Sequence, residues 1–104
     1  MAQFDVFVNP ISRARRAYPL VAVVQADLAD TGRDRIVAPL ALKARLEGSV
    51  GRMTPHVEID GAEYVLLVPA MTAIHLGDLR DRKGQLTRYR DAIVAALDFL
   101  FLGV

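Results

Sequence analysis

The hydrophobic pattern of the chain changes its period once, near Gln85. Before that point apolar residues alternate with polar ones, as they do in strands with one buried face. After it, apolar residues recur at steps of three and four, the spacing of one helix face: Leu86, Tyr89, Ile93, Leu97 and Leu100 or Phe101. This change predicts a mostly β fold that ends in one α-helix, with Gly103 placed to end the helix.

Turn residues divide the first part of the chain into short strands. We expect these strands over Phe4–Val8, Tyr18–Gln25, Arg35–Leu40, Thr54–Ile59, Glu63–Val68 and Met71–Leu76. Asp60-Gly61 lies between two alternating runs and is a strong signal for a two-residue hairpin turn. Because proline cannot donate to a strand ladder, Pro39 predicts an edge or a bulge in its strand.

The remaining segments have the composition of loops. We expect a basic hairpin loop over Ile11–Ala17 and a turn over Ala26–Gly32, in which Asp30 bonds backbone amides ahead of it. Ala41–Val50 is ambiguous and is predicted as a loop with a helical turn. Gly77 and Gly84 are predicted as isolated turn residues.

The length and composition indicate one domain that associates with a partner. A chain of 104 residues suits a single domain, residues 1–104. Hydrophobic residues make up 53% of it, which is more apolar surface than a small core can hide, so we expect a homodimer. The formal net charge of +1 gives no general attraction to nucleic acid, and we expect no direct specific DNA binding.

The cysteine content and the two ends of the chain predict where in the cell the protein is found. The absence of cysteine excludes disulfides, thiol nucleophiles and thiolate metal sites. Met1–Asp5 lacks a basic region followed by a long apolar stretch, so we expect a cytoplasmic protein. Ala92–Val104 is interrupted by Asp98 and is shorter than the roughly 20 residues that span a bilayer, so we expect no membrane anchor.

Few residues have the types and spacing that catalysis requires. His56 and His75 are the only histidines, and neither has a metal-ligand spacing with a carboxylate. Ser12 and Ser49 lack the context of a nucleophile, and there is no glycine-rich phosphate loop. We therefore predict no catalytic residue, no metal and no cofactor. Two basic clusters are predicted as solvated loops, with phosphate contact as the alternative: Arg13, Arg15 and Arg16, and Arg80, Arg82 and Lys83.

Three motifs stand out along the chain: Val24-Gln25-Ala26-Asp27 followed by Asp30-Thr31, the strand Ile36–Leu40, and the closing aromatic-x-Gly-aliphatic tail Phe101–Val104. Together with the Asp60-Gly61 hairpin and the final helix, they resemble the CcdB family of toxin-antitoxin toxins over nearly the full length. The resemblance implies a small antiparallel β-barrel or sheet of the CcdB/Kid-like type, with a C-terminal helix and a tight homodimer.

The same resemblance implies a role in binding and no covalent chemistry. Toxins of this family wedge into the dimerisation region of the DNA gyrase A subunit and trap gyrase on cleaved DNA, in modules linked to plasmid maintenance. A disordered segment of a CcdA-like antitoxin wraps the toxin and releases it. The gyrase-binding positions implied for this chain are Leu102, Gly103 and Val104, with support from Phe101 and Asp98, and the loop residues Ala26, Leu28 and Ala29.

The chain departs from the family at two places. It has no tryptophan, and Leu102 stands where the family has one. An indole can stack on an arginine for about 0.5 to 2 kcal/mol, whereas leucine has no such face. In the loop after the long strand, Ala26, Leu28 and Ala29 stand where the family has a serine and two branched aliphatics, which reduces the contact area there. Besides gyrase poisoning, two functions stay open: a CcdB-like protein that keeps its antitoxin without poisoning gyrase, and a toxin that cleaves messenger RNA on the same fold. The side chains available for RNA cleavage are Arg15, Arg16, His56 and Glu58. For the tail, the structural alternative is that Phe99–Leu102 only pack on the sheet and the partner subunit.

Overall fold

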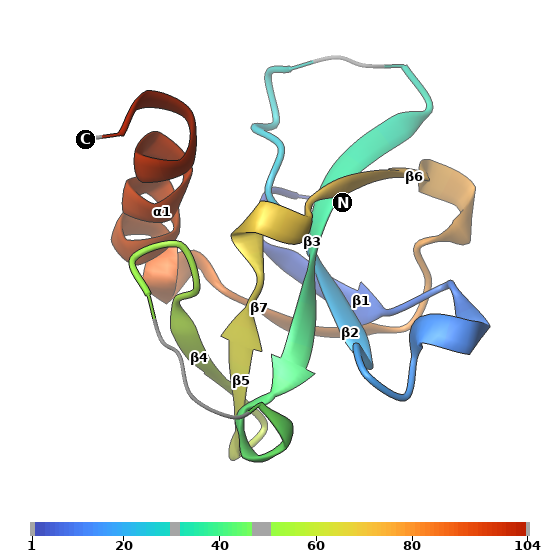
Figure 1. Cartoon of the computed structure of the whole chain (residues 1–104). Helices are drawn as coiled ribbons and strands as arrows, with labels where there is room; N and C mark the ends of the chain where they lie inside the picture. The colour runs from blue at the N-terminus through green and yellow to red at the C-terminus, as the bar shows by residue number, and fades with distance from the viewer. Residues whose placement is uncertain (1, 30–31, 47–50, 104) are drawn as a thin grey trace.

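The computed structural model describes residues 2–29, 32–46 and 51–103. Within these residues the chain forms seven strands followed by one α-helix (Figure 1). The elements are β1 (Asp5–Val8), β2 (Leu20–Val23), β3 (Asp34–Leu42), β4 (His56–Ile59), β5 (Ala62–Leu66), β6 (Thr72–His75), β7 (Arg82–Gln85) and α1 (Arg90–Leu102). The predicted class, mostly β with a C-terminal helix, is confirmed.

All strand pairs are antiparallel, and the sheet is organised around the nine-residue strand β3. The strand order is β4-β5-β3-β2-β1-β7, and β6 pairs with β3 beside that path. One edge of β3 pairs with β2, while the other edge pairs with β5 through Leu40–Leu42 and with β6 through Asp34–Val37.

The sheet curves into a half-barrel whose end strands approach each other. A Cβ built on Gly84 in β7 would lie 3.2 Å from Cγ2 of Ile59 in β4. Both strands line one groove of about 420 Å³. The absence of a side chain at Gly84 therefore lets the two ends of the sheet come close.

The Asp60-Gly61 hairpin is confirmed. Both turn residues have positive φ, 51° for Asp60 and 81° for Gly61, which is the backbone of a type I′ turn. The flanking strands pair Ile59 with Ala62 and Glu58 with Glu63. This register buries Val57 and Ile59 on one face of β4 and leaves Glu58 exposed on the other.

The prediction that Pro39 marks an edge or a bulge is wrong. Pro39 lies inside the central strand β3, opposite Val21, in a register that continues without a shift from Leu40 to Val37. Its carbonyl accepts a hydrogen bond from the N–H of Leu67 at 2.9 Å. On that edge the partner of β3 changes from β5 to β6, so the missing N–H of the proline falls where no continuous ladder exists.

The start of the helix also differs from the prediction. Residues Arg82–Gln85 form strand β7, which pairs Gly84 with Val6, so Gly84 is a strand residue rather than a turn residue. A 3₁₀ turn over Thr87–Tyr89 follows, and α1 begins at Arg90. The strand was missed because its residues do not alternate in hydrophobicity, and its position is set by pairing with β1 and by the ion pair of Arg82 with Asp5.

Other boundaries differ by a few residues. β3 continues to Leu42, and the helical turn expected in Ala41–Val50 is a 3₁₀ turn over Lys43–Arg45. The expected role of Asp30 lies outside the described residues. Across residues 2–29, 32–46 and 51–103, no helix is long and apolar enough to cross a membrane.

Buried side chains form two clusters, one on each face of the sheet. The larger cluster joins the sheet to the helix through Leu40, Leu66, Leu86 and Ile93. The smaller one lies on alternate residues of the same strands, including Phe7, Val21, Val23 and Val37. In α1 only Ile93 and Ala96 are fully buried, so, as predicted, much of the helix circumference does not face the sheet.

Candidate functional site

The end of α1 presents two large apolar side chains to solvent. Phe101 is 68% exposed and Leu102 is 70% exposed. Asp98 lies three and four residues before them, so the helical spacing puts it on their side of the helix, where it is also exposed. Within the single chain, and among the residues described, Phe101 and Leu102 therefore do not pack on the sheet, as the structural alternative would require.

Gly103 ends the helix as the sequence predicts. It has a φ of 72°, in the left-handed region, and its N–H donates to the carbonyl of Phe99 at 3.0 Å. The helix therefore ends directly after Leu102. Val104, the last predicted site residue, lies outside the described residues.

The other residues of the last turn hold the exposed pair in place. Leu97 and Leu100 pack against the main core cluster. The ring of Phe99 is half-buried, and the guanidinium of Arg52 lies 4.2 Å from its centroid. Phe101 and Leu102 are therefore carried on a helix end that the neighbouring residues Leu97 and Leu100 attach to the core.

The loop between β2 and β3 presents a third apolar side chain. Leu28 is 98% exposed, and its neighbours Ala26 and Ala29 are exposed as well. The N–H of Ala29 donates to the carbonyl of Ala26 at 3.0 Å, which makes Ala26–Ala29 a tight turn with Leu28 near its apex. In Figure 1 this loop and the C-terminal end of α1 both lie towards the top of the molecule.

Two polar side chains shape this turn. Gln25 is buried, donates from Nε2 to the carbonyl of Ala29, and accepts at Oε1 from the N–H of Ile36 at 2.9 Å. Asp27 accepts at Oδ1 from the N–H of Gln3 at 2.7 Å. The sequence motif contains both residues, but it does not show that they build the turn. The available signal was the polar Gln25 directly after an apolar strand.

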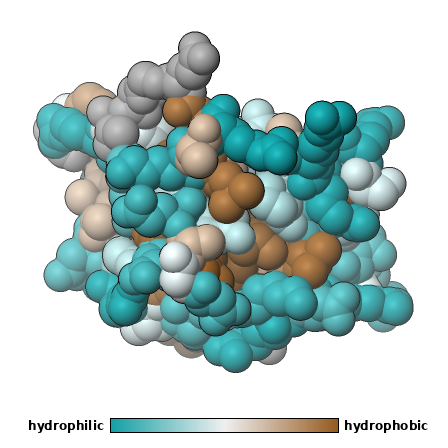
Figure 2. All heavy atoms as spheres, turned by 90° about the horizontal axis from the view of Figure 1, so that it is seen from below, coloured by the Kyte–Doolittle hydropathy of each residue, from teal (hydrophilic) through white to brown (hydrophobic). Residues whose placement is uncertain are grey.

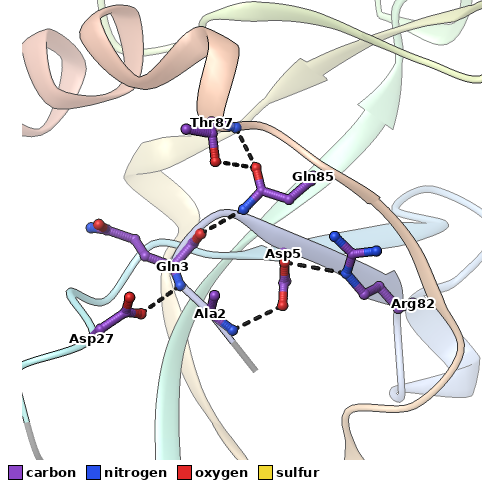
Figure 3. A network of polar contacts seen from close by, with 7 residues as sticks. All are labelled: Ala2, Gln3, Asp5, Asp27, Arg82, Gln85 and Thr87. Carbon is purple, nitrogen blue, oxygen red and sulfur yellow. Dashed lines mark hydrogen bonds and ion pairs between the residues drawn. The ribbon is translucent and has the colours of Figure 1, made fainter.

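Gln3 extends this network towards the helix, as Figure 3 shows. Its Nε2 donates to the carbonyl of Val24 at 3.1 Å, and its own carbonyl accepts from Nε2 of Gln85 at 2.9 Å. Oε1 of Gln85 in turn accepts from the N–H and the hydroxyl of Thr87, in the turn before α1. A continuous series of polar contacts thus joins the Leu28 turn to the start of the helix segment.

A buried carboxylate lies beside this series. Asp5 is 6% exposed, accepts from the N–H of Ala2 at 2.8 Å, and pairs with Nε of Arg82 at 3.2 Å (Figure 3). The pair joins β1 to β7. The charge of Arg82, a member of the basic cluster Arg80, Arg82 and Lys83, is therefore paired within the protein.

Structural contacts also occupy other members of the basic clusters. Arg15 donates from Nε to the carbonyl of Asn9 at 2.8 Å, and Arg80 to the carbonyl of Gly77 at 3.2 Å. Both line a groove of about 590 Å³ together with Asp78 and Asp81, so its charge is mixed. This groove has no strongly basic character of the kind that phosphate binding favours.

Another groove, of about 390 Å³, is lined by Arg13, Arg16 and Arg45. Tyr18 and Leu46 line it as well, together with two alanines. Figure 2 shows the underside of the molecule, the end where the turn Lys43–Arg45 lies in Figure 1. Hydrophilic residues cover most of that face around a small apolar band.

The side chains considered for RNA cleavage do not come together. Arg15 and Arg16 lie in the loop between β1 and β2, whereas His56 and Glu58 lie in β4, on the other side of the molecule in Figure 1. The cation nearest Glu58 is Arg88, whose Nη2 lies 3.4 Å from Oε1 of Glu58. The hydrogen bond from Arg88 to the Tyr89 hydroxyl, with the Glu58 carboxylate close by, raises the pKa of the Arg88 guanidinium.

Neither histidine lies in a cluster that could bind a metal within the described residues. Nδ1 of His75 accepts from the N–H of Gly77 at 3.0 Å, at the start of a 3₁₀ turn. His56 is half-buried, and in the described part of the chain its Nε2 has no hydrogen-bond partner. The described residues also contain no group of three His, Cys, Asp or Glu side chains placed to hold a metal ion.

Comparison with known proteins identifies the family of this chain. No curated protein matches the chain. The model of the CcdB protein family matches residues 3–103, a range that includes the Leu28 turn, the half-barrel and the end of α1 through Gly103. Because this match spans nearly the whole chain, the protein belongs to the CcdB family, whose members are toxins of toxin-antitoxin systems.

Proposed function

We propose that this chain is a toxin that binds the dimerisation region of the gyrase A subunit and holds DNA gyrase on cleaved DNA. The family match supports this function, and the main structural observation behind it is the exposed pair Phe101 and Leu102 on a helix end that Leu97 and Leu100 attach to the core. Exposed apolar side chains that are held in one place are suited to be the centre of an interface, because little conformational freedom remains to be lost on binding.

The binding surface has two parts in this proposal. The first is the end of α1, with Leu102, Gly103 and Val104 as its tip and with Phe101 and Asp98 beside them. The second is the Ala26–Ala29 turn, where Leu28 provides the large contact. Leu102 buries less area than an indole and cannot stack on an arginine, so we expect weaker binding than a tryptophan would give.

The toxin acts by binding and not as an enzyme. Family membership supports this, and so does the separation of Arg15 and Arg16 from His56 and Glu58. In the cytoplasm its partners are gyrase and a CcdA-like antitoxin, whose disordered segment wraps the toxin and removes it from gyrase.

The functional unit is a homodimer. Ala92 and Ala95 are exposed on α1, and small side chains on a helix allow the close approach of a second copy. Light scattering at micromolar concentration tests this: the expected mass is twice that of one chain, and a stable, folded monomer contradicts it.

A second function is favoured by one observation. Because the chain has no tryptophan, a family member that binds its antitoxin without poisoning gyrase is the alternative. Inducing the protein in a gyrase-bearing host decides between the two. Arrested growth with trapped gyrase–DNA complexes and intact messenger RNA supports poisoning, whereas normal growth with antitoxin binding supports the alternative. Cleaved messenger RNA without trapped gyrase contradicts both.

A further inference from the structure

The Ala26–Ala29 turn carries the most exposed large apolar side chain of the described residues, and that turn is tied at both ends. Leu28 is 98% exposed. On one side Gln25 binds the carbonyl of Ala29, and on the other Asp27 binds the N–H of Gln3 at 2.7 Å. A leucine at the apex of an unsupported loop would sample many positions, whereas this one is held by contacts on both sides of it.

The contact of Asp27 reaches a segment that is itself fixed. Gln3 bonds Gln85 (Figure 3) and Val24. The next residue, Phe4, donates its N–H to the carbonyl of Val23 at 2.6 Å. Phe4 has a φ of 72°, a conformation that a large L-residue adopts only when its surroundings hold it there. The N–H that Asp27 binds is therefore a firm anchor, and a carboxylate makes a stronger bond to it than a neutral acceptor does.

We propose that Asp27 is a positioning residue for target binding: its bond to Gln3 fixes the turn so that Leu28 is presented in one place. This inference rests on the proposed function, in which the turn contacts gyrase. Asp27 itself needs no contact with the target, because its effect passes through Leu28. Fixing the apex before binding removes part of the ordering cost that association would otherwise carry.

The test uses the full chain, the gyrase A dimerisation fragment and four variants: Asp27→Ala, Asp27→Asn, Leu28→Ala and the double variant Asp27→Ala/Leu28→Ala. Asparagine keeps an oxygen that can accept from Gln3, so it serves as the conservative rescue. Two quantities are measured for each: the affinity for the fragment, and the NMR order parameter of the Leu28 N–H in the free protein, which falls from about 0.85 in rigid backbone to below about 0.6 in flexible backbone.

We expect Asp27→Ala to lower the Leu28 order parameter and to weaken binding roughly 2- to 10-fold, the effect of ordering about one side chain on association. Asp27→Asn should retain most of both quantities. In the Leu28→Ala background, Asp27→Ala should weaken binding no further, because the side chain that it positions is gone. A role of Asp27 in general stability alone would weaken binding equally in both backgrounds.

Two results would overturn the inference, and they differ from a failure of the proposed function. If the Leu28 order parameter is unchanged in Asp27→Ala, Asp27 does not fix the turn. If the losses from Asp27→Ala and Leu28→Ala are additive, Asp27 acts on binding by another route. If Leu28→Ala itself binds the fragment as the unchanged chain does, the turn is not part of the gyrase surface, and that component of the proposed function falls together with the inference.

Discussion

The hydroxyl oxygen of Tyr89 accepts a hydrogen bond from the backbone N–H of Glu58 at 3.0 Å. Glu58 lies in β4, the end strand of the sheet, and Tyr89 lies in the 3₁₀ turn that leads into α1. The bond therefore occupies a backbone donor of β4 that has no partner in the β4–β5 hairpin and attaches this strand to the segment that carries the helix. Edge strands with free donors can pair with other chains, so this contact also protects the edge.

Replacing Tyr89 with phenylalanine should remove this bond, together with the exposed bond that Arg88 donates to the same hydroxyl, and lower the free energy of unfolding by about 0.5 to 1.5 kcal/mol. Urea unfolding measures the change. Tyr64→Phe is the matched control, because Tyr64 is half-buried and its hydroxyl makes no hydrogen bond within the described part of the chain. Equal losses in the two variants would show that the Tyr89 bond does not stabilise the sheet edge.

The substitution Gly84→Ala tests how closely the end strands β4 and β7 of the half-barrel approach each other. In Gly84→Ala the new methyl group would lie 3.2 Å from Cγ2 of the buried Ile59, so the ends of the sheet must separate slightly, at a cost of about 1 kcal/mol or more. Gly51→Ala is the control, because a Cβ at Gly51 meets nothing within 4 Å. Thermal unfolding should show a lower midpoint for Gly84→Ala alone. An unchanged midpoint for Gly84→Ala would mean that β4 and β7 are not in close contact.

The sequence was sufficient to predict the elements whose signals are local. Asp60-Gly61 has both residue types that a type I′ turn requires, and Gly103 follows the last apolar step of the helix, so both were predicted correctly. β7 could not be predicted in this way, because Arg82 and Gly84 are held in a strand by β1, a segment far away in the sequence. The prediction for Pro39 was wrong for the same reason. A proline fits inside β3 because the pairing partner on that edge changes from β5 to β6 beside it, and this cannot be read from the local sequence.

In the candidate site, too, local features could be predicted from the sequence and tertiary contacts could not. The sequence shows that Phe101 and Leu102 are apolar residues at the end of a helix. The resemblance to the CcdB family pointed to them, and to Leu28, as site residues. The contacts that hold the Leu28 turn could not be predicted, because Gln3 and Asp27 meet only after β1 and β2 pair. Such contacts depend on tertiary structure, and no local spacing encodes them.

Leu102→Trp should strengthen binding to the gyrase A dimerisation fragment. An indole adds apolar area and can stack on an arginine, which corresponds to roughly a 2- to 30-fold gain in affinity. Leu46→Trp is the control, since Leu46 is 37% exposed and lies away from the proposed surface. A similar gain in both variants would indicate nonspecific apolar adhesion and not a binding tip.

The central claim is that the end of α1 is a binding tip, and deletion of Gly103 and Val104 tests it most directly. Gly103 contributes one backbone hydrogen bond to the helix end and is exposed, so the shortened chain should keep its fold. Calorimetric titration with the gyrase A dimerisation fragment should then show no measurable binding, while circular dichroism and the dimeric mass stay unchanged. A shortened chain that folds and binds the fragment with the affinity of the full chain would contradict the account.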